Sequence, residues 1–294
     1  MFQKTVKEKV ICEGYGLHTG EFSRVTIHPA EASYGIVFIK KNGSSIRYIP
    51  LKPQSIKNTL FATTIGDEVV TISTVEHLLA TLNGFGIDNA IIEVEGDELP
   101  GGDGSANIFS QAIFDAGVIT FSDLSNAITF DRKFTVEYND GYITYLPDDL
   151  LTINGTIDFS HPKILKQVFV YKNSMERFIS DLSNARTFGF LKDYSTMQAL
   201  GLAKGSSLEN TIVLDETDVM NIGGLRYNDE FIRHKILDLL GDLYIIGNTI
   251  NGRINSYKSG HALNHLFVQQ IISMMESNTI IEQELIKPAV VFSY

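Results

Sequence analysis

The order of predicted strands and helices constrains the fold of this chain more than any other feature. In the first half, short β-branched runs lead into an apolar helical segment at residues 75–84. In the second half, strands are predicted at residues 134–138 and 142–146, and helices follow them. Strands followed by helices are typical of α+β domains rather than of a doubly wound parallel sheet. Because residues 121–127 interrupt the periodic segments, we predict two α+β units.

Two helical segments with matching spacing indicate that these units are related. His77 and His234 are each followed seven residues later by a glycine, and most apolar positions in between agree. One such match is weak evidence for a repeat by itself. Together with the repeated order of elements, it leads us to expect two domains of related topology, residues 1–124 and residues 125–294.

Local patterns also predict where the first helix begins and ends. Ser73 and Glu76 have the spacing of a capping box, in which Ser73 is the N-cap. Gly84 follows the apolar positions and is predicted to end this helix. A second helix is expected at residues 107–116.

The composition excludes several classes of protein. The chain has 24 Lys and Arg against 35 Asp and Glu, a formal net charge of −11, so we expect no nucleic-acid partner. No apolar run approaches the roughly 18 residues that span a bilayer, and we expect at most peripheral contact with a membrane. Cys12 is the only cysteine, and no secretory signal is recognisable, which favours a cytoplasmic location.

The most informative polar pattern lies in the second half. His234 and Asp238 are four residues apart, so a helix places both side chains on one face, and the apolar residues around them indicate burial. A buried charge needs a partner. The pair by itself fits a simple His–Asp hydrogen bond better than a metal site.

His77 shifts this balance toward a metal. It follows Glu76 and occupies the position that matches His234, so it is a third ligand offered by the other half. Two histidines and one carboxylate, with an open fourth position, are typical of catalytic zinc, which acidifies a bound water. Glu76 is then placed to act as general base. Helix capping is the other interpretation of Glu76, and the sequence does not separate the two roles.

The remaining histidines are less specific. His261 follows a Ser-Gly pair at the start of a helix, where it could protonate a leaving group. His261 and His265 have the spacing of a metal pair, but no third ligand or base lies beside them. We expect His18, His28 and His161 to lie in turns or extended segments without a catalytic role. No P-loop, GxSxG or dinucleotide-binding motif is present.

Longer motifs support a specific resemblance. In chain order they read EGYGLHTG, STVEHLLATLNGFGIDNA, DGSA, ARTFGF, NDEFIRHKILDLLGDLYIIG and SGHALN. With them the chain strongly resembles the zinc-dependent UDP-3-O-acyl-N-acetylglucosamine deacetylases, which catalyse the committed step of lipid A synthesis in Gram-negative bacteria. The similarity extends from about Lys4 to about Phe267. It implies a UDP-linked acylated amino sugar as substrate and an α+β fold with helices sandwiched between two sheets.

The resemblance also implies a metal site and a base. Its ligands would be His77, His234 and Asp238, holding Zn²⁺, with Fe²⁺ as the alternative in the cell. Glu76 would be the general base.

Four further residues acquire roles through the resemblance. His261 would be the proton donor, oriented by Asp242. Thr187 would help to hold the oxyanion of the tetrahedral intermediate. Lys235 would contact the anionic part of the substrate.

The segment after ARTFGF has an apolar repeat. Leu191, Tyr194, Met197 and Leu200 recur every third residue, which by itself favours a core stripe along one helical face. The resemblance implies instead a hydrophobic passage for a fatty acyl chain. We therefore predict that Phe188, Leu191 and Tyr194 bind substrate.

Two departures from the family pattern affect expectations about the substrate. Gly101–Gly102 stands where the family usually has two apolar residues, and His265 stands where it often has Asn. Neither changes a predicted ligand, base or acid, but acyl length and affinity are left open, as is the oligomeric state. A non-catalytic nucleotide-sugar-binding homologue and an amidase for another N-acetylated amino sugar are the alternative functions.

Overall fold

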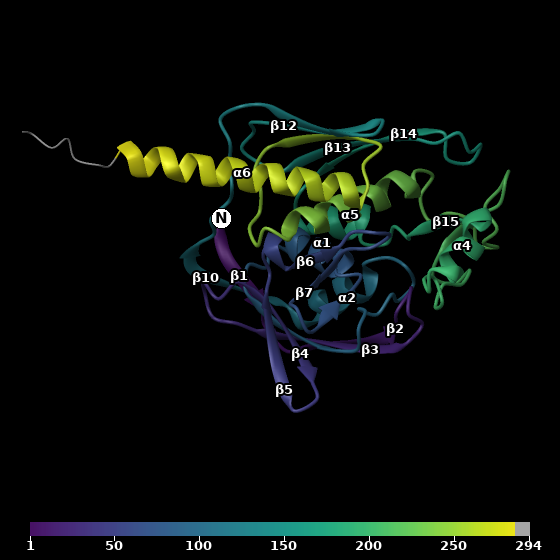
Figure 1. Ribbon diagram of the computed structural model, residues 1–294, viewed down its shortest axis with the longest axis horizontal. Coiled ribbons are helices and arrows are strands. Elements are labelled where there is room, and N and C mark those ends of the chain that lie inside the picture. The colour runs from purple at the N-terminus through teal and green to yellow at the C-terminus, as the bar shows by residue number, and fades with distance from the viewer. Residues whose placement is uncertain (286–294) are drawn as a thin grey trace, which may run out of the picture.

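The computed structural model describes residues 1–285, and Figure 1 shows how its elements are arranged. The strands of the first half are β1 (Phe2–Val6), β2 (Val10–Tyr15), β3 (Phe22–Pro29), β4 (Ile36–Asn42), β5 (Ser45–Pro50), β6 (Ile56–Asn58), β7 (Thr64–Gly66), β8 (Thr71–Ile72), β9 (Ala90–Glu95) and β10 (Val118–Leu124). Those of the second half are β11 (Phe134–Tyr138), β12 (Gly141–Leu146), β13 (Thr152–Asp158), β14 (Lys166–Lys172), β15 (Phe188–Phe190), β16 (Ile212–Leu214) and β17 (Arg253–Tyr257).

Six α-helices and three short helical turns join these strands. The α-helices are α1 (Glu76–Phe85), α2 (Asn107–Ala116), α3 (Met175–Arg177), α4 (Tyr194–Ala199), α5 (Glu230–Tyr244) and α6 (His261–Leu285). The turns are η1 (Pro53–Ser55), η2 (Phe178–Leu182) and η3 (Leu191–Asp193). Within residues 1–285, no helix has both the length and the sustained apolar character that a membrane span requires.

The two five-stranded sheets share one topology. The first has the order β2-β3-β9-β4-β5 and the second the order β11-β12-β17-β13-β14. In both sheets the third and fourth strands are parallel, and every other pair of neighbours is antiparallel. Helix α1 precedes β9 as α5 precedes β17, and α2 and α6 follow these strands. The predicted fold of two related α+β units is confirmed.

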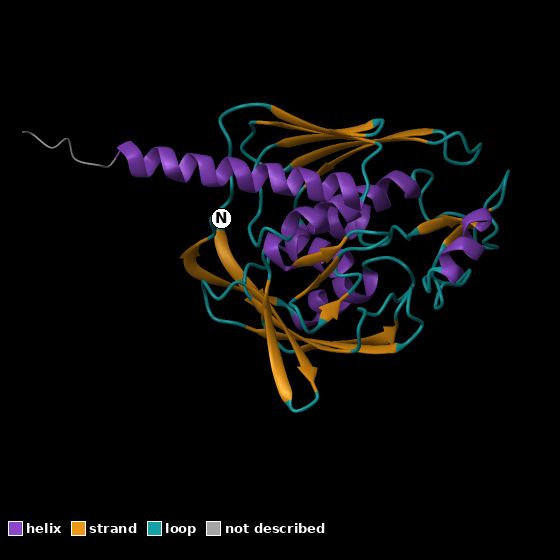
Figure 2. Cartoon of the chain, in the orientation of Figure 1, coloured by secondary structure: helices purple, strands orange, loops and turns teal. Residues whose placement is uncertain are grey.

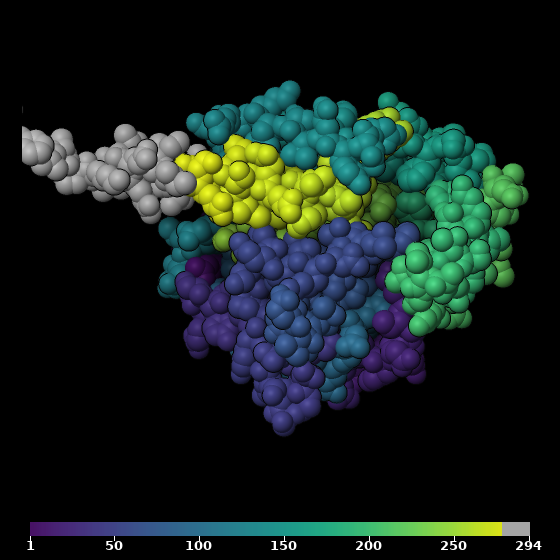
Figure 3. Space-filling view, viewed as in Figure 1, coloured from purple at the N-terminus to yellow at the C-terminus, as the bar shows by residue number. Residues whose placement is uncertain are grey.

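Helices α1, α2 and α5 and the first part of α6 lie between the two sheets, as Figure 1 and Figure 2 show. One face of each sheet is buried against them, and the alternating burial along β13 is typical of such a strand. In the space-filling view of Figure 3, the first half lies below and the second half above, and the green segment around α4 forms the right-hand rim. Strand β10 pairs with β1 and ends at Leu124. The division at residues 124 and 125 remains a prediction, and residues 286–294 of the second unit lie outside the described residues.

Helices α1 and α5 pack directly against each other, and a glycine makes this possible. A Cβ at Gly241 of α5 would lie 2.0 Å from the carbonyl oxygen of Glu76 in α1. A Cβ at the matching Gly84 would lie 2.4 Å from the ring of Phe178. Both glycines of the repeated His-to-Gly spacing therefore allow close approach. At α5, that approach brings the two histidine-bearing helices together.

The predicted capping box is wrong, although the helix itself is present. Helix α1 begins at Glu76, and the backbone of Thr74 has φ 57°, in the left-handed region, so a helix cannot start at Ser73. Ser73 instead pairs its hydroxyl with that of Thr64. The helix ends at Phe85 rather than at Gly84. The predicted helix at residues 107–116 is confirmed as α2, and the two predicted strands as β11 and β12.

Candidate functional site

Three potential metal ligands meet where α1 and α5 pack together. His77 lies in the first turn of α1, and His234 and Asp238 lie on successive turns of α5. The Nε2 atom of His234 lies 3.3 Å from Oδ1 of Asp238, and that of His77 lies 3.8 Å from the same oxygen. One ligand atom from each residue lies within 4.8 Å of the others, and all three side chains are buried. Across residues 1–285, no other cluster of His, Cys, Asp and Glu has this geometry.

The two imidazole rings are oriented by backbone groups. His234 Nδ1 donates to the carbonyl oxygen of Ala185 at 3.0 Å, and the ring of His77 faces the backbone of Ser105. Their planes are nearly perpendicular, with centroids 5.1 Å apart. Because Nδ1 of His234 is occupied, its Nε2 lone pair is the one that faces Asp238. Backbone acceptors that fix the tautomer in this way are typical of metal-binding histidines.

The charge states of this cluster also fit a divalent cation. Burial and the neighbouring His234 lower the pKa of His77 to about 4, and burial lowers the pKa of His234 as well. Neutral imidazoles offer lone pairs. Burial opposes ionisation of Asp238, but His234 and Lys235 outweigh it and hold the pKa of this carboxyl below its ordinary value. Two neutral histidines and one carboxylate are a donor set that suits zinc.

Glu76 lies beside this cluster, at the start of α1. Its Oε2 atom accepts a hydrogen bond from the backbone N–H of Thr63 at 3.0 Å. Burial raises the pKa of Glu76 to about 8, and the carboxylates of Asp242 and Asp238 contribute while His261 opposes. A carboxyl group with this pKa holds its proton at neutral pH, and a cation bound by the neighbouring cluster would favour the ionised form that a general base requires.

His261 reaches the same region from the start of α6. Its Nδ1 atom lies 2.8 Å from Oδ2 of Asp242, a residue of α5. Asp242 also accepts hydrogen bonds from the Thr63 hydroxyl and, at 2.8 Å, from the Asn264 amide. Burial lowers the pKa of His261, but Asp242 outweighs this effect, and together with Asp238 and Glu76 it raises the pKa to about 9. The ring is therefore protonated at neutral pH, and its Nε2–H is a free donor.

Lys235 and Phe188 connect this cluster to a neighbouring cavity. The ammonium of Lys235 lies 2.9 Å from Oδ2 of Asp238 and 5.6 Å from the centre of the Phe188 ring. Thr187, which precedes β15, is half-buried, and its backbone N–H donates to Gly104 at 2.8 Å. Thr187 and Phe188 both line the cavity.

The cavity has a volume of about 620 Å³ and a largely apolar wall. It lies between the turn at residues 17–18 and the segment around α4, the green rim in Figure 3. Three of the four residues of the predicted apolar repeat line it, and these are Leu191, Tyr194 and Met197. Leu200 does not line the cavity and is 60% exposed. The four residues of the repeat therefore do not form part of the hydrophobic core, because they face the cavity or solvent.

His18 is a residue of this region that the sequence pattern did not single out. The expected turn is present, but it is folded against the site, and the buried His18 lines the cavity. Burial lowers the pKa of His18. The carboxylate of Glu98 acts in the opposite direction, and the nearby His261 lowers this pKa further. Its Nδ1 atom has no hydrogen-bond partner among the described residues. Only its place between two glycines drew attention to it.

A second such residue is Glu98, whose buried carboxylate joins the turn to α1. It accepts hydrogen bonds from the backbone N–H groups of His18 and Thr19 and from the hydroxyls of Thr19 and Thr74. A Cβ at Gly16 would lie 2.3 Å from this carboxylate, so only glycine fits there. Glu98 thus holds Thr74 in its left-handed conformation, directly before the helix that carries Glu76.

The other sequence candidates lie apart from the cluster. His265 contacts Gln269 through Nε2 at 3.0 Å, and the metal-pair spacing of His261 and His265, which the sequence already disfavoured, finds no support. His161 contacts the carbonyl oxygen of Asp215. Gly101–Gly102 does not line the cavity, although Gly101 packs near Leu17, which does.

Comparisons of the sequence with a family profile and with curated proteins all identify the same family. The family profile described as UDP-3-O-acyl N-acetylglycosamine deacetylase matches residues 3–273. The UDP-3-O-acyl-N-acetylglucosamine deacetylase of Nitratiruptor sp. is 39% identical over 282 residues, which cover 96% of this chain and 94% of the relative. The protein of the same name from Shewanella oneidensis is 41% identical over 280 residues, covering 94% and 92%.

Proposed function

We propose a mechanism for this chain from one premise: it belongs to the UDP-3-O-acyl-N-acetylglucosamine deacetylase family. The chain is accordingly a hydrolase that removes the N-acetyl group from a UDP-3-O-acyl-N-acetylglucosamine, in the synthesis of lipid A. Water is consumed, and acetate and the free amine are released. The observation that carries the mechanism is the convergence of His77, His234 and Asp238 beside Glu76 and His261.

We infer that His77, His234 and Asp238 hold a divalent metal ion, with zinc as the first candidate and Fe²⁺ as the alternative. Their buried, neutral imidazoles and ionised carboxylate fit such an ion. When bound, zinc supplies Lewis-acid catalysis, which polarises the amide carbonyl and acidifies the attacking water.

Glu76 takes the proton from that water. Burial raises its pKa to about 8, so the carboxylate binds a proton more strongly than an exposed glutamate does, and a cation held by His77, His234 and Asp238 would keep it ionised before the reaction. Its position next to His77 keeps it at the reacting centre. The bond from Thr63 holds one oxygen, which leaves the other free to accept the proton. The hydrogen bond to the Glu76 carboxylate comes from Thr63, a residue outside α1.

His261 gives a proton to the leaving amine. Its Nδ1–H is held by Asp242, so Nε2–H is the donor. Because its pKa is raised to about 9, the imidazolium is present at neutral pH. Asp242 therefore orients the acid and also stabilises its charge.

The remaining predicted residues position the substrate. The hydroxyl of Thr187 donates to the developing oxyanion, and removal of one such donor commonly lowers the rate by ~10²–10³. The acyl chain occupies the apolar cavity against Phe188, Leu191 and Tyr194. Lys235, already paired with Asp238, adds positive charge on the side from which an anionic diphosphate approaches.

The test combines metal analysis with a deacetylation assay. We expect one divalent metal ion per chain and release of acetate from the UDP-linked acyl sugar. A chain that binds no stoichiometric metal would contradict the mechanism. Turnover of a different N-acetylated amino sugar in preference to this one would favour the amidase alternative, and metal binding without turnover would favour a non-catalytic homologue. A series of acyl-chain lengths measures what the cavity accepts.

A further inference from the structure

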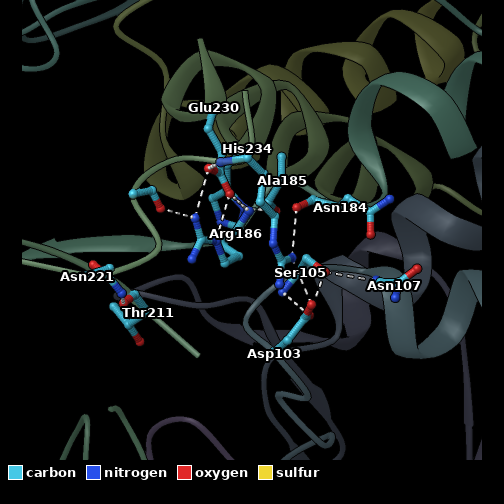
Figure 4. A network of polar contacts seen from close by, with 12 residues as sticks. Asp103, Ser105, Asn107, Asn184, Ala185, Arg186, Thr211, Asn221, Glu230 and His234 are labelled. Carbon is cyan, nitrogen blue, oxygen red and sulfur yellow. Dashed lines mark hydrogen bonds and ion pairs between the residues drawn. The ribbon is translucent and has the colours of Figure 1, made fainter. Parts of the chain in front are cut away.

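We propose that Asp103, Arg226 and Glu230 form a brace between the two halves that positions both histidine rings for the metal. We call these residues, with Arg186, the inter-half brace. The inference rests on the proposed function, since it concerns the ligands of the proposed zinc ion. Figure 4 shows most of the network, including Asp103, Ser105, Ala185, Arg186 and Glu230.

The brace reaches His77 through the first half of the chain. The backbone of Ser105 faces the ring of His77. Ser105 is itself held by Asp103, whose Oδ1 accepts from the Ser105 hydroxyl at 2.6 Å and from its backbone N–H at 3.1 Å. The other carboxylate oxygen of Asp103 lies 2.7 Å from Nη1 of Arg226, a residue of the second half.

The same guanidinium reaches the segment that orients His234. Nη1 of Arg226 donates to the carbonyl oxygen of Asn184 at 3.0 Å. The next carbonyl along the chain, that of Ala185, accepts the hydrogen bond from His234 Nδ1. Arg226 therefore contacts both Asp103, which holds the segment beside His77, and Asn184, which precedes the carbonyl that orients His234.

Glu230 fixes this segment from the other side. Its carboxylate accepts from the backbone N–H of Arg186 at 3.0 Å and from the Arg186 guanidinium at 2.9 and 3.1 Å. It also accepts from the backbone N–H of Arg226 at 2.6 Å. Glu230 is fully buried and lies one helical turn before His234 on α5. The helix that carries the ligand thus also holds the chain that orients its ring.

The location of the Asp103–Arg226 pair favours a positioning role over a stabilising one. The side chains of Asp103 and Arg226 are 33% and 34% exposed, and ion pairs of that kind contribute little to stability. The two rings, however, come from different halves, so their relative orientation depends on whatever ties the halves together near them. Loss of outer-shell partners of this kind commonly weakens metal binding by ~10- to 100-fold.

The experiment measures zinc affinity in the full-length, metal-stripped protein by competition with a chelator. We expect Arg226→Met to weaken Zn²⁺ binding about tenfold. Arg253→Met is the matched control, because it makes the same change in the Arg253–Asp148 pair, which is 2.9 Å long and outside this network. It should leave Zn²⁺ affinity unchanged.

Two further variants test whether the residues act as a unit. Glu230→Gln should weaken Zn²⁺ binding as well. Asp103→Asn and Arg226→Met are then combined in a double-mutant cycle. Each single substitution removes the same Asp103–Arg226 ion pair, so the fold-loss of Zn²⁺ affinity in the double variant should be smaller than the product of the two single fold-losses. Melting temperatures of the metal-free proteins are measured alongside. If these residues have only a structural role, the substitutions will lower the melting temperatures and leave the Zn²⁺ affinity unchanged. That result would contradict the proposed brace.

The outcomes separate the brace from the proposed function. If the unsubstituted chain binds one zinc and deacetylates substrate while Arg226→Met binds zinc equally tightly, the brace is wrong and the function stands. If the unsubstituted chain binds no zinc, both fail. Multiplicative losses in the cycle would show that Asp103 and Arg226 act separately, which also contradicts the brace.

Discussion

Helices α1 and α5 occupy the same place in two halves of identical sheet topology, yet they carry different chemistry. When His77 is matched with His234, the residue one turn later is Thr81 in α1 and Asp238 in α5. The hydroxyl of Thr81 donates to the carbonyl oxygen of His77, within its own helix. The carboxylate of Asp238 points instead to both histidines. Under the proposed assignment, one helix would supply one metal ligand and the other would supply two.

The two helices also differ in where their functional residues lie. Glu76 and His77 both belong to the first turn of α1, directly after the left-handed Thr74 that Glu98 holds. The functional residues of α5 extend along several turns, as far as Asp242. The chemistry of α1 thus depends on the loop that leads into it, whereas that of α5 depends on the helix itself. Substitutions in each helix can test this division.

The largest effect is expected from removal of the single ligand in α1. His77→Ala should abolish stoichiometric zinc binding and lower kcat/KM at least ~10⁴-fold, because Lewis-acid activation and the acidified water are lost together. Metal analysis and the deacetylation assay measure both. Thr81→Val, one turn later on the same helix, should retain the metal. Full turnover by His77→Ala would refute the ligand assignment.

The next largest effect is expected from substitution of the proposed base, Glu76, which is adjacent to the proposed ligand His77 in the first turn of α1. Glu76→Gln should lower kcat roughly 10²–10⁴-fold and keep stoichiometric zinc, because the amide can still accept from Thr63 but cannot take up a proton. Single-turnover kinetics and metal content are the measurements. Loss of zinc in this variant would mean that Glu76 supports the metal rather than the proton transfer.

A smaller effect is expected where the two helices touch. Gly241→Ala removes a helical glycine, a change that would by itself stabilise a helix by about 1 kcal/mol. The new Cβ would meet the backbone of Glu76, and overpacking of this kind costs about 1–3 kcal/mol, so we expect net destabilisation and weaker zinc binding. Urea unfolding of the metal-free protein measures the first effect. Gly223→Ala, where no atom lies within 4 Å of the added Cβ, is the control.

The smallest expected effect is a change in the pH dependence of activity, which we assign to His261. His261 must be protonated to act as an acid, and because its pKa is raised to about 9, activity should fall about tenfold per pH unit above that value. Asp242→Asn removes the main charge that raises this pKa, so the alkaline limb should move to lower pH. A pH–rate profile of kcat for both proteins provides the measurement. An unmoved limb would show that another group controls it.

Local patterns in the sequence were sufficient for the fold class and for part of the site. The helix expected at residues 107–116 is α2, with the same bounds, and the four-residue spacing of His234 and Asp238 placed them on one face of α5. The capping box failed because Glu98, 24 residues from Thr74, holds the preceding backbone in a conformation that no helix can continue. A local pattern cannot report a contact of that kind.

The sequence by itself determined which residue types were present and which shared a helix face, because helical and strand periods are properties of neighbouring residues. Only the tertiary structure decided which distant groups meet. It brought His77 to Asp238, turned the His18 loop onto Glu98, and placed Arg226 between Asp103 and Asn184. These contacts join residues far apart in the chain, and they form only because two similar sheets enclose the helices between them. Their energies depend on burial and orientation, which are set by packing and have no period in the sequence.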